Sequence, residues 1–402
     1  MVSEMEATER ERRRAERERR RAGDERSAGW SRVLAGACGA LALATLIGLV
    51  VLWPGAGPSQ AGGPALGGPT LPAVAAGVTT VDCGGPVAQP CVELHVRLRS
   101  GRAAAITLGP AGTVRAPKAG THVRVRAAGG EYTFAGVDRR RALLVLALIF
   151  AVLVVAIARA RGLLALAGLA ISIALVTRFV LPALLAGESG LLVAVVGSLA
   201  VMFVTVVLTY GLSPPSLAAC LGIGVSLLFA AGAGTVAVKA TALDGGLGEL
   251  TAYLAGSGRG ISMQGLVLAG LVVGALGVLA DTGVTQASAV MALRRANPAL
   301  SARALFHGAF TVGRDHLVAT THTLVLAYLG ASLPLLLGLG AGGVSPTDAL
   351  NSQDVAEPIV ATLVGAIALL VSVPLTTALC VAVAHRMPVS ALGGAEAHAH
   401  AH

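Results

Sequence analysis

Charged residues are scarce in this chain, and their scarcity excludes most classes of soluble protein. Only 13% of the 402 residues are Asp, Glu, Lys or Arg, whereas 55% are hydrophobic and the mean hydropathy is +0.77. A water-soluble globule of this size rarely has such a balance, because too few polar side chains are available to cover its surface. The composition therefore predicts an integral membrane protein, with the lipid bilayer as its main partner.

Cysteines are also few, which argues against a disulfide framework or a cysteine-rich metal site. Three of the five, Cys38, Cys220 and Cys380, lie in apolar runs, where cysteine packs as a small hydrophobe. The other two, Cys83 and Cys91, flank a Gly-Gly-Pro turn. We expect them to form a disulfide if their compartment is oxidising, and we expect no metal site and no cofactor.

The net charge of +9 does not indicate a nucleic-acid partner. The run from Arg10 to Arg21 is rich in arginine, but glutamates are interleaved with the arginines about one helical turn apart. The run is nearly neutral. We therefore expect residues 1–32 to form a solvated cytoplasmic segment in preference to an arm that binds nucleic acid or lipid.

The first apolar run, Val33 to Leu52, is long enough to cross a bilayer core, so residues 33–53 are predicted to be the first transmembrane helix. Small residues follow Trp53, which leaves cleavage after this span as the alternative. Residues 54–73 are rich in Gly and Pro and read as a linker. At the other end, residues 386–402 are predicted to be a disordered tail with incidental histidines.

Residues 74–138 have a different pattern, because hydrophobic and polar residues alternate there. Val92, Leu94, Val96 and Leu98 alternate with charged residues or His95, and glycine-containing turns separate such runs. This is strand periodicity. The segment is predicted to form four or five short strands that close into a small extracytoplasmic barrel, with a possible protein partner.

Apolar runs resume after this segment, and residues 142–385 are predicted to hold seven more transmembrane helices. The fold class is thus an all-α transmembrane bundle of about eight helices with a small β-rich extracytoplasmic domain. For residues 243–262 the sequence fits a short interfacial helix and an ordinary glycine-rich loop equally well. The seven predicted spans cover residues 142–158, 163–185, 191–210, 217–238, 263–285, 316–339 and 359–384.

The basic residues of the short loops predict the orientation. A cytoplasmic N-terminus places seven arginines of the short loops on the cytoplasmic side, as the positive-inside rule requires: Arg159, Arg161, Arg294, Arg295, Arg303, Arg314 and Arg386. Arg139 to Arg141 would lie outside, which a long translocated domain tolerates. The predicted location is the cell membrane, with several crossings.

Two polar stretches interrupt the apolar runs. In the first, Asp281, Thr285 and Ser288 share one helix face, with Gln286 beside them. In the second, Gly313-Arg-Asp-His is followed one turn later by Thr320-Thr-His-Thr. Ionisable groups inside a membrane are costly and mark functional sites. The candidate polar site, at the cytoplasmic ends of two helices, comprises Asp281, Thr285, Gln286, Arg314, Asp315, His316 and His322.

The depth of these residues predicts a contact between the two helices. At a rise of about 1.5 Å per residue, Asp281 would lie about 9 Å inside the membrane, and His316 would lie at a similar level. We therefore expect Asp281 to lie within one side chain of Arg314 or His316, on a helix surface that faces protein.

The two polar stretches also carry a resemblance. Gly274 to Pro298, Gly313 to His316 and Thr323 to Leu337 are similar to motifs of the YibE/F-like family of bacterial multi-spanning membrane proteins. The resemblance extends from about residue 74 to residue 385. It implies a multi-spanning membrane architecture, and it implies no particular activity.

Three functions compete. A transporter or permease would use Asp281, Arg314, Asp315 and His322 to line a polar path. A non-catalytic scaffold or accessory subunit would bind a partner through its extracytoplasmic domain and use the ion pair to fasten two helices. A membrane hydrolase comes last, because no nucleophile and base are paired and no metal triad is present, so the protein is not expected to be an enzyme.

Overall fold

The computed structural model describes residues 32–55, 70–83, 89–128, 131–245 and 261–387. The N-terminal charged segment, most of the predicted linker, most of the segment that fits an interfacial helix or a loop and the His-containing tail lie outside the described residues. The chain divides into two compact units, one of residues 58–162 and the other of residues 1–57 with 163–402. Each unit is described by itself.

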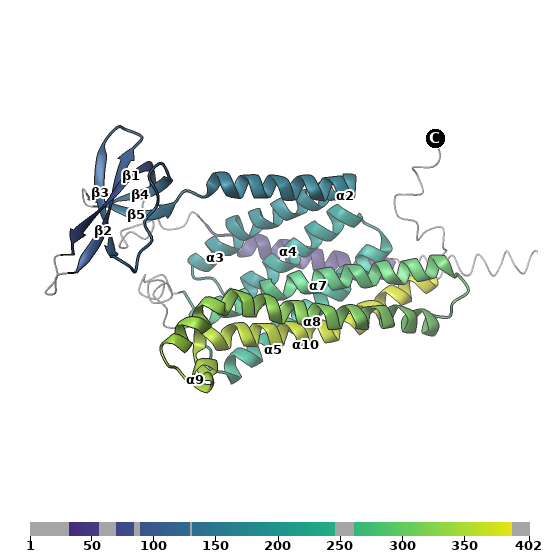
Figure 1. Ribbon diagram of the computed structural model, residues 1–402. Helices are drawn as coiled ribbons and strands as arrows, with labels where there is room; N and C mark the ends of the chain where they lie inside the picture. Colours follow the sequence, from purple (N-terminus) through teal and green to yellow (C-terminus); the bar gives the residue numbers. More distant parts are fainter. Residues whose placement is uncertain (1–31, 56–69, 84–88, 129–130, 246–260, 388–402) are drawn as a thin grey trace, which may run out of the picture. The chain divides into compact units, whose positions relative to one another are not determined.

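The smaller unit contains one antiparallel sheet of five strands, in the order β3-β2-β1-β4-β5 (Figure 1). The edge strands β3 and β5 contact one another, although no hydrogen-bonded pairing joins them among the described residues, so the sheet is strongly curled and not closed as a barrel. The strands are β1 (Thr70–Asp82), β2 (Pro90–Leu98), β3 (Ala103–Pro110), β4 (His122–Ala128) and β5 (Glu131–Val137).

The sheet encloses a small core of its own. The alternating hydrophobic residues of β2 and β4 point to one side, and Leu94, Val96, Val123 and Val125 are at most 1% exposed. Their polar neighbours in sequence therefore lie on the opposite side, as the period of two requires. A disulfide joins Cys83 and Cys91 across the ends of β1 and β2, with 5.1 Å between the Cα atoms.

The helix α2 (Arg140–Leu175) follows the sheet and begins in the smaller unit. Its backbone N–H at Arg140 donates to the Asp138 carboxylate at 3.1 Å, which satisfies one of the free N–H groups of the first turn. The helical path breaks at Arg159, where φ is 50° and ψ is −129°. The break separates two of the predicted spans, residues 142–158 and 163–185, which otherwise form one apolar stretch, Arg140–Leu185.

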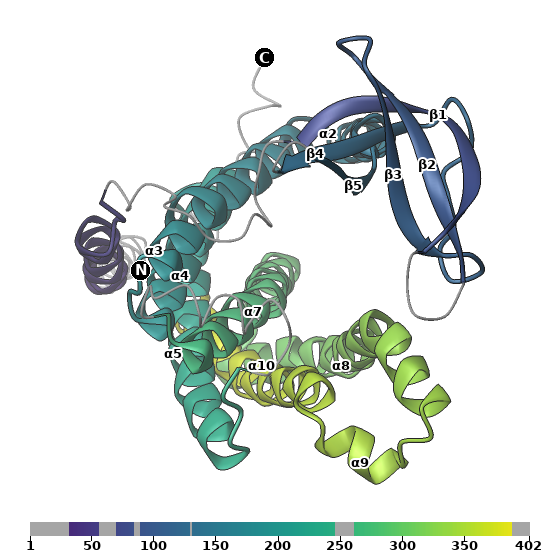
Figure 2. The same ribbon diagram turned by 90° about the vertical axis from the view of Figure 1, so that its left-hand side faces the viewer.

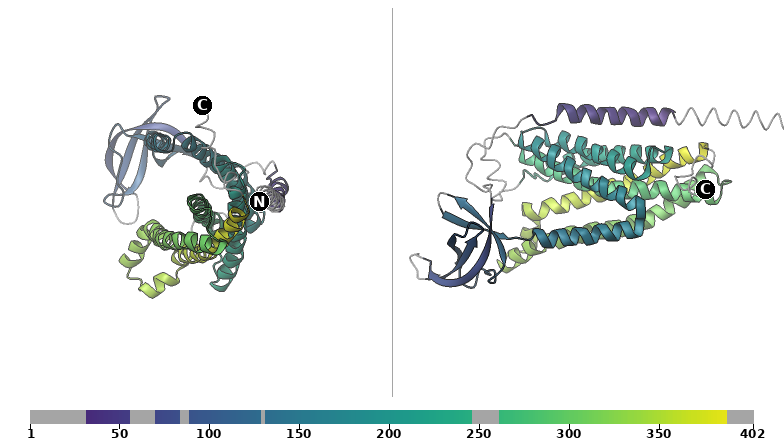
Figure 3. Two further views of the ribbon diagram at one scale, coloured as in Figure 1. Left: turned by 90° about the vertical axis from the view of Figure 1, so that its right-hand side faces the viewer. Right: turned by 90° about the horizontal axis from the view of Figure 1, so that it is seen from above.

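The larger unit is a set of helices that lie side by side along one common direction (Figure 3). The structure has seven helices, counted over the described residues, that are long and apolar enough to cross a membrane. Besides a first helix, Arg32–Val51, and the end of α2, the elements of this unit are η1 (Val176–Val180), α3 (Leu181–Leu185), α4 (Gly190–Tyr210), α5 (Pro214–Ala240), α7 (Met263–Ala296), α8 (Ala302–Ala341), α9 (Pro346–Asn351) and α10 (Gln353–Arg386).

Helix α7 is the centre of this unit, because it packs against α4, α5, α8 and α10 (Figure 2). Small residues allow the close approach: a methyl group added at Gly283 would lie 2.3 Å from the Ile223 side chain of α5. One added at Gly222 would lie 2.5 Å from Thr376 Oγ1 of α10. Such close contacts are typical of helices packed in a membrane, where small residues let backbones approach.

Helices α7, α8 and α10 are longer than the apolar runs from which they were predicted. Helix α7 continues to Ala296, eleven residues beyond the predicted end at residue 285 (296 − 285 = 11). Helix α8 starts at Ala302, where the Ser301 hydroxyl accepts the Ala304 N–H at 3.2 Å, and not near residue 316. Hydropathy detects only the apolar part of a helix, whereas caps and packing set its ends.

Candidate functional site

The helix hairpin of α7 and α8 brings two ionisable side chains together. His316 Nε2 of α8 lies 3.5 Å from Asp281 Oδ2 of α7. A carboxylate and an imidazole at this distance form an ion pair when the histidine is protonated, and they can exchange a proton. The pair is therefore suited to binding or relaying a proton or a cation.

The pair is more open than expected. The Asp281 side chain is 66% exposed and that of His316 is 33% exposed, so the rest of this chain does not cover the carboxylate. The expectation of a protein-facing surface for Asp281 is wrong within the single chain. The reason is geometric: the next residue, Thr282, points into the helix bundle and is fully buried, which turns Asp281 away from it.

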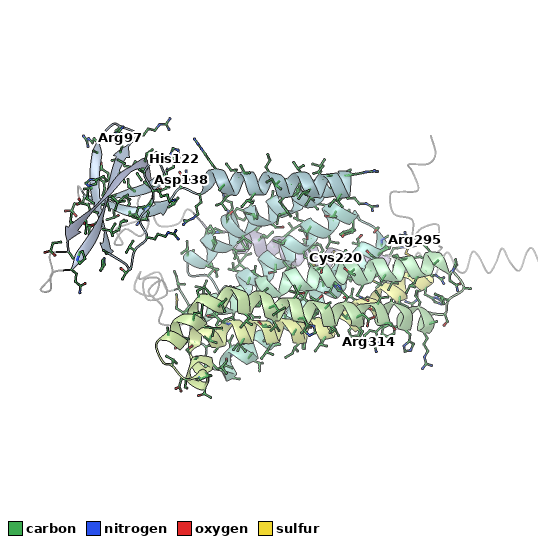
Figure 4. All side chains as sticks on the ribbon, in the orientation of Figure 1. Arg97, His122, Asp138, Cys220, Arg295 and Arg314 are labelled. Atoms are coloured by element: carbon green, nitrogen blue, oxygen red, sulfur yellow. A yellow bond between two sulfur atoms is a disulfide. The ribbon has the colours of Figure 1, made fainter. Side chains whose placement is uncertain are left out.

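The other predicted residues of α8 do not converge on Asp281. Arg314 Nε lies 4.0 Å from Asp315 Oδ1, and both side chains are about two-thirds exposed or more, at 67% and 77% (Figure 4). His322 is exposed, and its Nδ1 lies 2.9 Å from the backbone oxygen of Val318 in its own helix. Among the described residues, none of these three side chains forms an ion pair with Asp281 or His316.

Gln286 lies one turn beyond Thr282 and is the centre of a second, fully buried arrangement. Its side chain is 0% exposed and packs against Gly313 of α8, where an added methyl group would lie 2.4 Å from Gln286 Nε2. On α10, Thr377 Oγ1 lies 2.9 Å from Oε1 of the Gln286 amide. The Gln286 side chain of α7 therefore contacts two other helices, α8 and α10.

The Thr377 hydroxyl has two acceptors within reach. It donates to Gln286 Oε1 at 2.9 Å and to the Val373 backbone oxygen at 2.6 Å, so its one hydrogen is shared between them. On the other side of the same amide, Gln286 Nε2 is buried and has no hydrogen-bond partner among the described residues.

Three hydroxyl groups near this level are buried without a partner in the described part of the chain. They belong to Thr282 of α7 and to Ser372 and Thr376 of α10, and each residue is 0% exposed. Unpaired polar atoms in an apolar interior are costly and rare, so each one needs an explanation. We name Thr282, Gln286, Ser372, Thr376 and Thr377 the buried polar cluster.

The buried polar cluster lies near the middle of the bundle, and not at the helix ends as expected. Thr376 packs on Gly222, which is eight residues, or about 12 Å, from Pro214, the first residue of α5 (222 − 214 = 8). Ser216 Oγ donates to the Tyr210 backbone oxygen, so the start of α5 is level with the end of α4. Since the 21 residues of α4 span about 31 Å, the cluster is close to half-depth.

Sequence reasoning found the α7 side of this arrangement and missed the α10 side. Ser372 and Thr376 lie one turn apart on one face of an otherwise apolar helix, and Thr377 follows Thr376 directly, which was a usable signal. Thr285, the remaining predicted site residue, is half-buried beside Gln286. Groups of three or more His, Cys, Asp or Glu close enough to hold a metal are absent from the described residues. The polar atoms of the buried polar cluster belong to hydroxyl and amide groups. Such oxygens suit water, a small hard cation or a polar solute.

Comparison with known proteins identifies the family. The family model described as YibE/F-like protein matches residues 146–386, and the chain belongs to this family. The match covers every helix of the site. Neither the search of the curated proteins nor that of the solved structures gave a match.

Proposed function

We propose that this YibE/F-like protein is a permease of the bacterial cell membrane, in which the Asp281–His316 pair and the buried polar cluster line the path of a small solute or ion. The observation that carries the proposal is the position of the two groups on α7: Asp281 of the ionisable pair is the immediate neighbour in sequence of Thr282, whose buried hydroxyl has no partner among the described residues, although the two side chains point to different sides of the helix. Polar groups at this depth are otherwise avoided, and they mark solute sites and proton relays.

The pair and the cluster have complementary roles in this proposal. The exposed Asp281 carboxylate exchanges protons with water, whereas the Nε2 atom of His316 beside it is itself buried, and the carboxylate would couple movement of the solute to a proton. The buried oxygens would replace part of the hydration shell of the solute. The resulting mechanism is binding and release at half-depth, with protonation of the pair favouring one of two states.

A scaffold is the second candidate, and the 66% exposure of Asp281 favours it. A carboxylate facing lipid is costly, so a second protein could cover this face of α7 and α8. In that case the Asp281–His316 pair fastens a helix hairpin and moves nothing.

The two functions differ in what happens when Asp281 is neutralised. Purified protein in vesicles loaded with a pH-sensitive dye is screened with ions and small metabolites, which are chosen from those that a deletion strain fails to take up. We expect Asp281→Asn to abolish the solute-dependent pH change while the inserted amount and the unfolding temperature remain those of the wild type. Asp315→Asn is the matched control, because it removes the same charge at a residue whose one ion pair among the described residues is with Arg314.

The scaffold makes the opposite prediction. Asp281→Asn would then lower the unfolding temperature or the inserted amount, and any loss of flux would be proportional to the loss of folded protein. Equal flux per folded molecule in Asp281→Asn and the wild type would refute the permease.

The proposed topology has eight crossings with a cytoplasmic N-terminus, because the break at Arg159 allows the stretch Arg140–Leu185 to cross twice. A cysteine introduced at Ser100, in the turn between β2 and β3, reports the side of the sheet. We expect an impermeant thiol reagent to label it in intact cells. Labelling that requires opening of the inner membrane would reverse the orientation.

A further inference from the structure

The smaller unit contains a cavity of about 770 Å³ at the junction between the sheet and the start of α2. It is separate from the site described above, and neither the proposed permease nor the family match requires it. The polar side chains that line it are Arg97, Arg99, His122, Asp138, Arg140 and Arg141. We name this cavity the arginine pocket.

The register of the sheet places the pocket residues on one face. Arg97 of β2 pairs with Val74 of β1, and Val74 pairs with His122 of β4, so the three side chains form a row across the strands. Arg99 follows the end of β2 directly; its backbone N–H donates to the Pro72 oxygen of β1 at 3.4 Å, and its side chain lines the same cavity. In Figure 4 the labelled residues Arg97, His122 and Asp138 all lie in the upper part of the sheet.

The residues that follow the sheet extend the lining of the pocket into the first turn of α2. The backbone N–H of Asp138 donates to the His122 backbone oxygen at 2.9 Å, which fixes the chain beside β4. The Asp138 carboxylate then accepts the N–H of Arg140. Arg140 and Arg141, the first two residues of α2, thus line the pocket where the helix begins.

The pocket has an excess of positive charge. Four arginines oppose one aspartate, so with a neutral histidine the net charge of the lining is +3 (4 − 1 = 3). Among the described residues, no ion pair joins any of these four guanidinium groups to a carboxylate. Arg124, on the same strand as His122, provides the contrast, because its guanidinium group donates to the hydroxyl and backbone oxygens of Thr70.

The sequence after Arg141 determines where the pocket lies relative to a bilayer. Ala142 begins the apolar part of α2, whose most hydrophobic window has a mean hydropathy of 2.9 and no buried residue. A helix with such a surface is in contact with lipid. The arginines directly before it therefore lie at the level of the lipid head groups.

We propose that the arginine pocket binds the phosphate head group of an anionic phospholipid in the leaflet from which α2 enters the membrane. Guanidinium groups bind phosphate oxygens in bidentate geometry, and they do so more specifically than a point charge. The cavity is larger than one phosphate requires and is within the size range of sites for whole ligands. The lipid would anchor the sheet against the bilayer.

The proposal is tested with the full-length protein in detergent, by native mass spectrometry during titration with phosphatidylglycerol or phosphatidylcholine of the same acyl chains. We expect the wild type to bind phosphatidylglycerol more tightly, and Arg97→Gln with Arg99→Gln to weaken that binding about 25-fold, or about fivefold per arginine. Arg102→Gln with Arg115→Gln is the matched control, because these two arginines are exposed in the same unit and do not line the cavity.

A second variant separates charge from geometry and guards against misfolding. Arg97→Lys with Arg99→Lys keeps the charge and loses the bidentate fork, so we expect affinity between those of the wild type and the glutamine variant. An intact Cys83–Cys91 disulfide and an unchanged unfolding temperature show that each variant is folded.

Three results would overturn the proposal. One is equal affinity for the two lipids, and another is equal loss in the pocket variant and the control variant. The third is displacement of phosphatidylglycerol by millimolar inorganic phosphate, which would make the pocket a site for soluble anions. A loss confined to the pocket variants, with lipid retained in the presence of phosphate, supports the lipid head group.

Discussion

Replacing Gly313 by alanine tests the buried polar cluster most directly. The new methyl group would lie 2.4 Å from Gln286 Nε2 and 2.7 Å from both Cδ and Oε1 of the same amide. All three distances are shorter than a van der Waals contact. The amide cannot move aside freely, because Gln286 is fully buried and bonded to Thr377.

The magnitude follows from three contributions. Overpacking in a tight interior costs about 1 to 3 kcal/mol. Loss of the hydrogen bond between Gln286 and Thr377 costs about 1 kcal/mol. The higher helix propensity of alanine stabilises the helix and offsets these losses by up to about 1 kcal/mol. We therefore expect Gly313→Ala to lower the free energy of unfolding by about 2 kcal/mol, measured by titration of detergent micelles with a denaturing detergent.

Gly330→Ala is the matched control, because it lies in the same helix α8 and an added methyl group there meets no atom within 4 Å. It makes the same change in helix propensity, so the difference between the two variants isolates the contact with Gln286. In a Gln286→Ala background, Gly313→Ala should cost less than about 0.5 kcal/mol, which gives a coupling energy of about 2 kcal/mol. Equal stability of Gly313→Ala and Gly330→Ala would show that the packing of α8 on Gln286 is wrong.

Two further predictions address the remaining contacts. Replacement of Cys83 and Cys91 by serine should destabilise the smaller unit by about 2.5 kcal/mol relative to the oxidised wild type, the loop-closure value for a loop of this length, and should leave it as stable as the reduced wild type in denaturant titrations. Gly222→Ala should destabilise the helical unit by about 1 to 3 kcal/mol in the same detergent titration, because the methyl group meets Thr376; Gly232→Ala, on the same helix with open space, should not.

The spacing of hydrophobic residues along the sequence predicted much of the fold, because the strands of the sheet and the long helices each keep one spacing throughout. The alternation from Val92 to Leu98 predicted strand β2, and Leu94, Val96 and Leu98 are buried in the structure as the period of two requires. Val92 is only half-buried, because the pairing with β3 shifts register between Val92 and Glu93. The number of strands, at four or five, was also correct. The predicted closure into a barrel was wrong, since closure depends on pairing between the edge strands, and no local pattern encodes that pairing.

The candidate site was harder to predict than the helices that carry it. The approach of Asp281 to His316 could be predicted because consecutive antiparallel helices place equal depths side by side. The contact of Gln286 with Thr377 joins helices that are far apart in sequence, so hairpin register gives no information about it. Helix ends were also underestimated, and this error placed the site too shallow.

The exposed charges of α7 and α8 constrain what surrounds this protein. Asp281, Arg314 and Asp315 are each about two-thirds exposed or more. A charged side chain costs about 2.5 to 3.5 kcal/mol at the centre of a lipid-facing helix, and the cost falls toward the interface. Three such residues on one hairpin would therefore offset much of the stability of a typical domain. The hairpin must face water or protein, and these two surroundings correspond to the permease and the scaffold. The unpaired oxygens of the buried polar cluster favour water, because a scaffold interface on the outside of α8 gives no reason for unsatisfied hydroxyl groups between α7 and α10.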